Sequence, residues 1–181
     1  MAQHKFTTDV FSAAYPALDK PATSGQYPSG MYEVTAFMTE SENADGIMSV
    51  SRAIEAAAKE AFGSNFDLET LNSTGIKKTD DGALKVLFKS KFQPKMQGPD
   101  ARSLPPDVVI GYGDKIRAAG HAWAWSRNNG RDKGITLMLS SIRLIEKAPA
   151  SDDFGGPEDG YEFETADEFG GVEETSVAIK F

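Results

Sequence analysis

Residues 115–127 show the clearest pattern in the chain, because small apolar residues alternate there with large polar and aromatic ones. Successive side chains of a strand point to opposite faces, so this alternation predicts a strand with two different faces. The even positions, from Ile116 to Ser126, form a small and mostly apolar face. The odd positions are Lys115, Arg117, Ala119, His121, Trp123, Trp125 and Arg127. Burying unpaired lysine and arginine is costly, so we expect the odd face to lie in solvent.

Other segments also have the composition of strands. Residues 4–15 have strand-like density, and residues 31–40 are rich in β-branched and aromatic side chains. Residues 134–146 are apolar almost throughout, and Asn129-Gly130 just before them is typical of a hairpin turn. We therefore expect the segments before and after this turn to pair.

Residues 84–92 alternate between apolar residues and lysines. The pattern predicts a half-buried strand with a basic outer face. Its predicted core residues are Leu84, Val86, Phe88 and Phe92, and its predicted outer residues are Lys85, Lys89 and Lys91.

One helix is predicted over residues 46–62. Asp45 is a candidate N-cap, and Gly63 a stop signal. The helix would present one apolar face, formed by Ile47, Val50, Ile54, Ala57 and Ala61. About five strands with one helix between the early strands predict a mainly β fold. The favoured form is a five-stranded, OB-fold-like Greek-key barrel, with a β-sandwich as the alternative.

The net charge of −8 is distributed unevenly along the chain. Residues 148–181 contain ten acids and one base, Lys180, for a net charge of −9, whereas the preceding 147 residues hold 17 acids and 18 bases, or +1. Low periodicity and high charge predict disorder. We expect an OB-fold domain over 1–147 and a disordered acidic interaction tail over 148–181.

The tail can act in several ways. It can occupy the basic groove of its own domain as a mimic of nucleic acid, or offer its apolar end to a pocket of a partner protein. Its candidate partner-binding residues are Asp152, Asp153, Glu173, Glu174 and Phe181. A merely solubilising tail is the alternative.

Several classes of protein are disfavoured by composition. The chain has no cysteine, and its histidines, His4 and His121, have no paired spacing. Neither a phosphate-binding loop nor a nucleophile-elbow motif is present. We therefore expect no catalytic residues, no metal and no cofactor. No apolar run reaches the roughly 18 residues of a membrane span, and no secretory signal is recognisable. We expect a cytoplasmic protein that does not bind membranes, in the host cytoplasm if it is viral.

The odd face of 115–127 combines indoles with cations, which suits single-stranded nucleic acid. Bases stack on aromatic rings for roughly 1–3 kcal/mol each, and lysine and arginine neutralise phosphates. The candidate nucleic-acid-binding residues are Tyr15, Phe37, Lys85, Lys89, Lys91, Tyr112, Lys115, Arg117, His121, Trp123, Trp125, Arg127 and Arg131. The alternative is that both tryptophans are structural. A β-bulge between Gly120 and Trp125 would turn one indole inward.

The block "VVIGYGDKIRAAGHAWAWSRNNGRDKGITLMLSSIRLIEK", followed by "DDFG", resembles a family of bacteriophage single-stranded DNA-binding proteins, formerly a domain of unknown function. "AAYPALDKP", "MYEVTAFM" and "GIMSVSRAIEAAAKEAF" fit the same layout, so the resemblance covers roughly residues 4–155. It implies an OB-fold and a role in phage DNA replication, recombination or repair. The leading hypothesis is therefore a protein that binds single-stranded DNA independently of base sequence.

The acidic tail ending in phenylalanine is similar to tails that recruit replication or recombination proteins and restrain DNA binding. Lys180 stands where a proline or an acid is more usual. Two other hypotheses remain: a protein-interaction or assembly module without DNA affinity, and, less favoured, a metal-dependent nuclease. The oligomeric state is left open.

Overall fold

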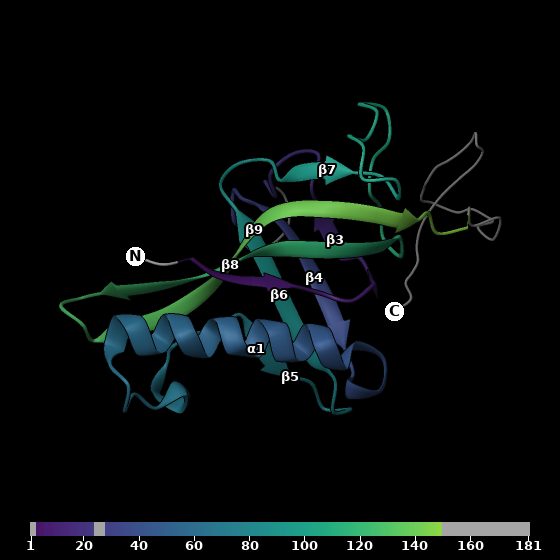
Figure 1. Ribbon diagram of the computed structural model, residues 1–181. Coiled ribbons are helices and arrows are strands. Elements are labelled where there is room, and N and C mark those ends of the chain that lie inside the picture. Colours follow the sequence, from purple (N-terminus) through teal and green to yellow (C-terminus); the bar gives the residue numbers. More distant parts are fainter. Residues whose placement is uncertain (1–2, 24–27, 150–181) are drawn as a thin grey trace. The chain divides into compact units, whose positions relative to one another are not determined.

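The computed structural model describes residues 3–23 and 28–149. Predictions for the tail, including those for Asp152 and Phe181, lie outside these residues. The described part is a mainly β fold with one α-helix and one short 3-10 turn (Figure 1). Among the described residues, none of the helices is long and apolar enough to cross a membrane. The mainly β, OB-fold-like class is confirmed.

The described chain forms nine strands rather than the five predicted. They are β1 His4–Thr7, β2 Phe11–Ser12, β3 Ala14–Ala17, β4 Tyr32–Met38, β5 Ile76–Lys78, β6 Leu84–Ser90, β7 Lys95–Gln97, β8 Lys115–Arg127 and β9 Asp132–Glu146. The extra strands are short. The segment 4–15 divides into separate pieces, and two predicted loops each contribute three residues, as β5 and β7.

The strands pair in the order β1-β8-β9-β6-β4-β3, while β2, β5 and β7 pair with β8, β6 and β9. β9 pairs in parallel with β6 and β7, and all other pairs are antiparallel. In Figure 1, the β8–β9 hairpin crosses β6 and β4, so the two parts of the sheet enclose a core. Three rings join them there: Phe88 stacks at 5.3 Å from Phe6 and 6.0 Å from Phe11.

The helix α1 spans Glu40–Phe62 and begins six residues before the predicted start. The helix bends at Asn43, whose side chain accepts a hydrogen bond from the Thr39 N–H and donates one to the carbonyl of Val10. The Gly46 N–H donates to the Asp9 carboxylate, at 2.9 Å. The predicted capping role of Asp45 is wrong, because the helix begins at Glu40 with Thr39 as its N-cap, so that Asp45 lies inside it.

The remaining helix predictions are mostly confirmed. Val50, Ile54 and Ala57 are buried, but Ala61 is exposed. Gly63 ends the helix with a φ of +103°, a conformation that favours glycine.

The predicted alternation of β8 is confirmed. Ile116, Ala118, Gly120 and Ala122 are buried, and the odd positions are exposed or half-buried. The pairing with β9 does contain bulges, but the extra residue lies on β9. Ala119 pairs with Ser141 and Gly120 pairs with Leu139, which leaves Ser140 without a partner on β8. Both indoles thus stay on the odd face.

Two further local predictions have opposite outcomes. The hairpin turn at Asn129-Gly130 is confirmed, with positive φ at Asn128, Asn129 and Gly130. The prediction that Phe92 faces the core is wrong: β6 ends at Ser90, and Phe92 is 80% exposed beyond it.

Replacing Gly120 by alanine should destabilise the fold by about 2–3 kcal/mol. A Cβ at this position would lie 1.9 Å from the Met138 carbonyl oxygen, where the bulge brings β9 close. Gly111→Ala is the matched control, because its Cβ would meet nothing within 4 Å. Chemical unfolding of both variants measures the effect, and equal midpoints would contradict the packing role of Gly120.

Candidate nucleic-acid interface

The candidate interface is the solvent-facing side of the sheet formed by β1, β8, β9, β7 and β6, which we call the outer face. Directly paired residues have their side chains on the same side, so the register shows which residues are neighbours. One row runs Lys5–His121–Met138–Lys89 across four strands. The next joins Ala119 to Ser141 and Lys95. Strands from separate parts of the chain, namely β1, β6, β7 and the β8–β9 hairpin, therefore build one surface.

The two tryptophans occupy different environments on this face. Trp123 pairs with Thr136 and is 50% exposed. Trp125 is half-buried and pairs with Gly134, where an added Cβ would lie 2.3 Å from the indole Cζ2. The Arg127 guanidinium lies 4.4 Å from the centre of the Trp125 ring. Trp125 is therefore packed by its own hairpin, whereas Trp123 is half exposed.

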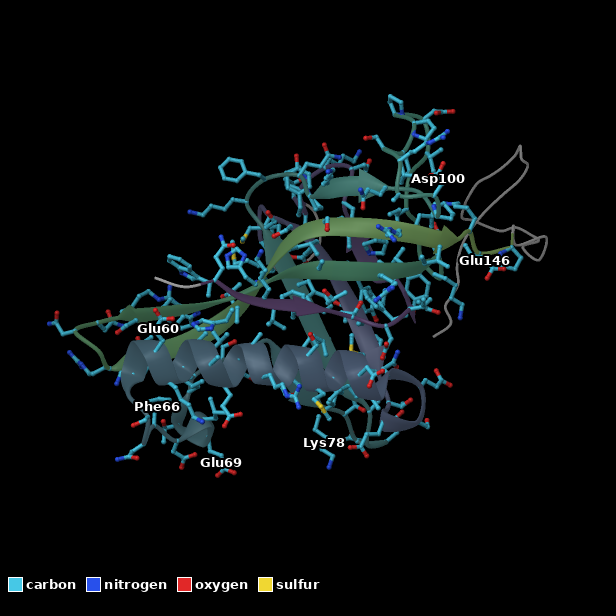
Figure 2. The ribbon with its side chains drawn as sticks, in the orientation of Figure 1. Glu60, Phe66, Glu69, Lys78, Asp100 and Glu146 are labelled. Carbon is cyan, nitrogen blue, oxygen red and sulfur yellow. The ribbon has the colours of Figure 1, made fainter. Side chains whose placement is uncertain are left out.

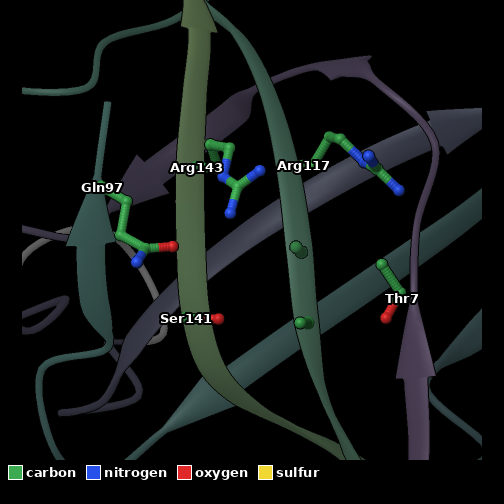
Figure 3. Close-up of a pocket in the computed structure, with 7 residues that line it drawn as sticks. Thr7, Gln97, Arg117, Ser141 and Arg143 are labelled. Carbon is green, nitrogen blue, oxygen red and sulfur yellow. The ribbon is translucent and has the colours of Figure 1, made fainter. Parts of the chain in front are cut away.

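Arg117 and Arg143 are paired directly across β8 and β9, and Figure 3 shows the Arg117 side chain extending away from Arg143, toward the strand that carries Thr7. The Arg117 Nε donates to the Thr8 carbonyl oxygen at 2.9 Å, which fixes that side chain. No ion pair to either guanidinium is found within residues 3–23 and 28–149. Both arginines line a depression of about 140 Å³ with Thr7, Gln97 and Ser141. Two cations paired directly across strands repel each other, so the depression suits an anion such as a phosphate.

His121 lies in the middle of the outer face and is half-buried. Burial lowers the pKa of its imidazole below the ordinary value of 6.5, because desolvation disfavours the charged ring. At pH 7 His121 is therefore neutral, and it contributes a polar side chain beside Trp123 rather than a permanent charge.

Three predicted aromatic residues gather at a separate place. The rings of Tyr15 and Tyr112 meet edge to face at 6.0 Å. Tyr112 also lines one depression with Phe37 and Lys115. Desolvation and then the neighbouring Tyr15 raise the pKa of Tyr112. Since Phe37 is 44% and Tyr112 47% exposed, both remain accessible to a ligand.

The other predicted lysines and Arg131 are dispersed. Lys89 joins the outer-face row through Met138, and Lys85 pairs with Phe37 on one side and Lys77 on the other. Lys91 lies beyond the end of β6, and Arg131 lies in the turn before β9; both are exposed. The structure thus brings most of the predicted residues into two groups and places Lys91 and Arg131 in neither.

Sequence reasoning missed Arg143, Lys5 and Gln97. Counting back from the hairpin turn pairs Arg117 with Ile142, which would send Arg143 into the core. The unpaired Ser140 shifts the register by one and turns Arg143 outward. A buried-strand pattern interrupted by "SS" and then by an arginine was the available signal. Nothing local in sequence places Lys5 beside His121.

We expect the His121 ring to titrate below pH 6.5 in NMR spectra of the folded protein. A folded-state pKa below the unfolded value means that His121 stabilises the fold above about pH 6.5, and that this contribution is lost as the pH falls through the folded pKa. His121→Gln should reduce the loss of stability in acid, and His4→Gln assigns the second ring. A titration midpoint at or above 6.5 would refute the desolvation of His121.

Comparisons of sequence find nothing similar: no protein-family model matches the chain, and no curated protein matches it. Comparisons of structure do find similar proteins. The single-stranded DNA-binding protein of bacteriophage Enc34, in complex with single-stranded DNA, matches with a TM-score of 0.63 and 16% identity, over 81% of this chain and 88% of that one. A second structure of the Enc34 protein matches with a TM-score of 0.60 and 18% identity, over 83% and 86%.

The gp2.5 single-stranded DNA-binding protein encoded by bacteriophage T7 matches with a TM-score of 0.62 and 18% identity, over 88% of this chain and 100% of that one. Both phage proteins are covered almost along their whole length. The chain therefore has the fold of these bacteriophage single-stranded DNA-binding proteins.

Proposed function

We propose that this protein belongs to the bacteriophage single-stranded DNA-binding proteins and binds single-stranded DNA without regard to base sequence. One observation carries the proposal: Trp123 is half exposed on a face that also presents Arg117, Arg143 and Lys5. The shared fold supports it, because a similar protein has been solved in complex with single-stranded DNA.

The chemistry of the outer face fits this ligand. A base stacks on the free face of Trp123, and this contact tolerates any base because every base has a π-face. A phosphate binds between Arg117 and Arg143, where charge and the fork geometry of guanidinium both suit it. Trp125 and Arg127 act as the support of this surface, and His121 adds a neutral polar contact.

We place this binding in a folded domain over residues 1–147, followed by an interaction tail over 148–181. Lys147 supports the boundary, because its ammonium donates to the buried Asp114 carboxylate at 2.6 Å and to the Val109 carbonyl at 2.8 Å. These bonds hold the end of β9 to the loop before β8.

The proposed setting is phage DNA replication, recombination or repair in the host cytoplasm. The tail acids from Asp152 to Glu174 compete with DNA, and Phe181 contacts replication or recombination proteins. The proposed role is binding rather than catalysis.

Trp123→Ala should weaken binding of oligo-dT by about tenfold, since one stacked base contributes roughly 1–3 kcal/mol. Fluorescence anisotropy of labelled oligo-dT measures the affinity, and binding should quench the tryptophan emission of the wild type. Met48→Ala is the control, because Met48 is 49% exposed on α1. Affinity should also fall steeply with salt. Failure of the wild type to bind at low salt would favour the assembly-module hypothesis.

Deleting residues 148–181 should strengthen binding of oligo-dT, most clearly at low salt, because the deletion removes ten acids and a single base. A full-length chain with those acids changed to asparagine and glutamine is the control for length, and should bind like the deletion variant. Weaker binding after deletion would show that the tail is not a competitor.

A further inference from the structure

A cleft of about 400 Å³ lies between β5, β6 and the loop that precedes β5. Its volume falls within the range of small-molecule binding sites, roughly 300–1,000 Å³. Half-buried apolar residues line it: Leu71, Ile76 and Leu87, of which Leu71 and Ile76 also pack against the core. Exposed polar residues border it: Ser73, Lys77 and Lys85. We call it the Lys77–Lys85 cleft. This combination suits a nucleotide, because an apolar surface can contact the base while the ammonium groups contact its phosphate.

The two lysines are paired directly across β5 and β6. Like charges in this position repel each other, and no ion pair to either lysine is found in the described parts of the chain. Arg117 and Arg143 show the same arrangement at the other depression. The sheet therefore carries two unneutralised cation pairs, and each of them borders a cavity.

The cleft adjoins the Trp125 end of the outer face. Gly134, which packs under the Trp125 indole, forms a bridge with Ser73 on the cleft wall. The Ile135 N–H also donates to the Ser73 carbonyl at 2.8 Å. Leu87 lies two residues from Lys89, which pairs with Met138. β9 therefore lies between the cleft and the tryptophans of β8, and it contacts both of them.

We propose that the Lys77–Lys85 cleft binds a second part of the same DNA strand that Trp123 stacks. Lys77 and Lys85 bind its phosphates, and Leu87, which lies on the same side of β6 as Lys85, receives a base. The strand then runs from Arg117 and Arg143 along β8, past the tryptophans and across β9 to β5. This inference rests on the proposed function and adds a second site to it.

The test uses the full chain and oligo-dT of about 20 nucleotides, longer than the roughly 4–16 that an OB-fold covers. Lys77→Gln/Lys85→Gln should bind about tenfold more weakly than wild type, and its slope of log affinity against log salt should fall by about 1.4, since each phosphate contact contributes about 0.7. The matched control is Lys20→Gln/Lys78→Gln, which removes the same charge from exposed lysines outside the cleft lining. Figure 2 labels Lys78, which follows Lys77 on β5.

Measuring the Tm of each variant distinguishes a loss of DNA binding from a loss of folding. The Tm of Lys77→Gln/Lys85→Gln should equal or exceed that of wild type, because a repulsion is removed. A Lys77→Arg/Lys85→Arg variant keeps both charges and should retain the affinity. Equal weakening of the cleft and control variants would overturn the inference, as would an unchanged salt slope. Those results leave Trp123 stacking intact, whereas a wild type that binds no DNA overturns the proposed function as well.

Discussion

The register between β8 and β9 is the constraint on which the rest of the outer face depends. Ser140 has no partner on β8, so the two halves of β9 are offset by one residue relative to β8. Below the bulge, Trp123 and Trp125 face Thr136 and Gly134; above it, Arg117 faces Arg143. Without the extra residue, an isoleucine would face solvent and an arginine would enter the core. The bulge needs a close approach of the two backbones, and Gly120 permits it.

Two pairs of like charges lower the stability of the folded sheet. Arg117 and Arg143, and likewise Lys77 and Lys85, are cations paired directly across strands without a described acidic partner. A fold selected only for stability would place an acid or a threonine opposite each of them. The apolar side of the same strands shows no such conflict, with Ile116, Ile142 and Leu144 buried. The repulsion between paired cations is confined to the solvent-facing surface, where a bound anion would neutralise it.

The sequence predicted the elements that depend on local periodicity. It did not predict the features that depend on contacts between segments distant in the chain. The alternation of β8 and the turn at Asn129-Gly130 follow from residues that are neighbours in the chain. The bend near the start of α1 does not, because Asn43 and Gly46 bond Val10 and Asp9, more than thirty residues away. The strands β5 and β7 are equally invisible, since three residues carry no period and pair only because β6 and β9 are already there. Arg143 was missed because a single unpaired residue changes its face.

The two tryptophans of β8 differ in exposure: Trp125 is packed against β9, whereas Trp123 is half exposed. The two indoles are on the same side of one strand, yet Gly134 lets β9 come close under Trp125, while Thr136 stands opposite Trp123. Arg127 covers the Trp125 ring, and Lys133 on the next strand lies 5.3 Å from the rings of Phe62 and Phe66, where η1 (Leu68–Thr70) follows α1. Glu60 near the end of α1 bonds His4 beside the same hairpin (Figure 2). The end of the hairpin is thus held by cation–ring contacts and by α1, so that the proposed stacking of a base on Trp123 would cost little conformational entropy.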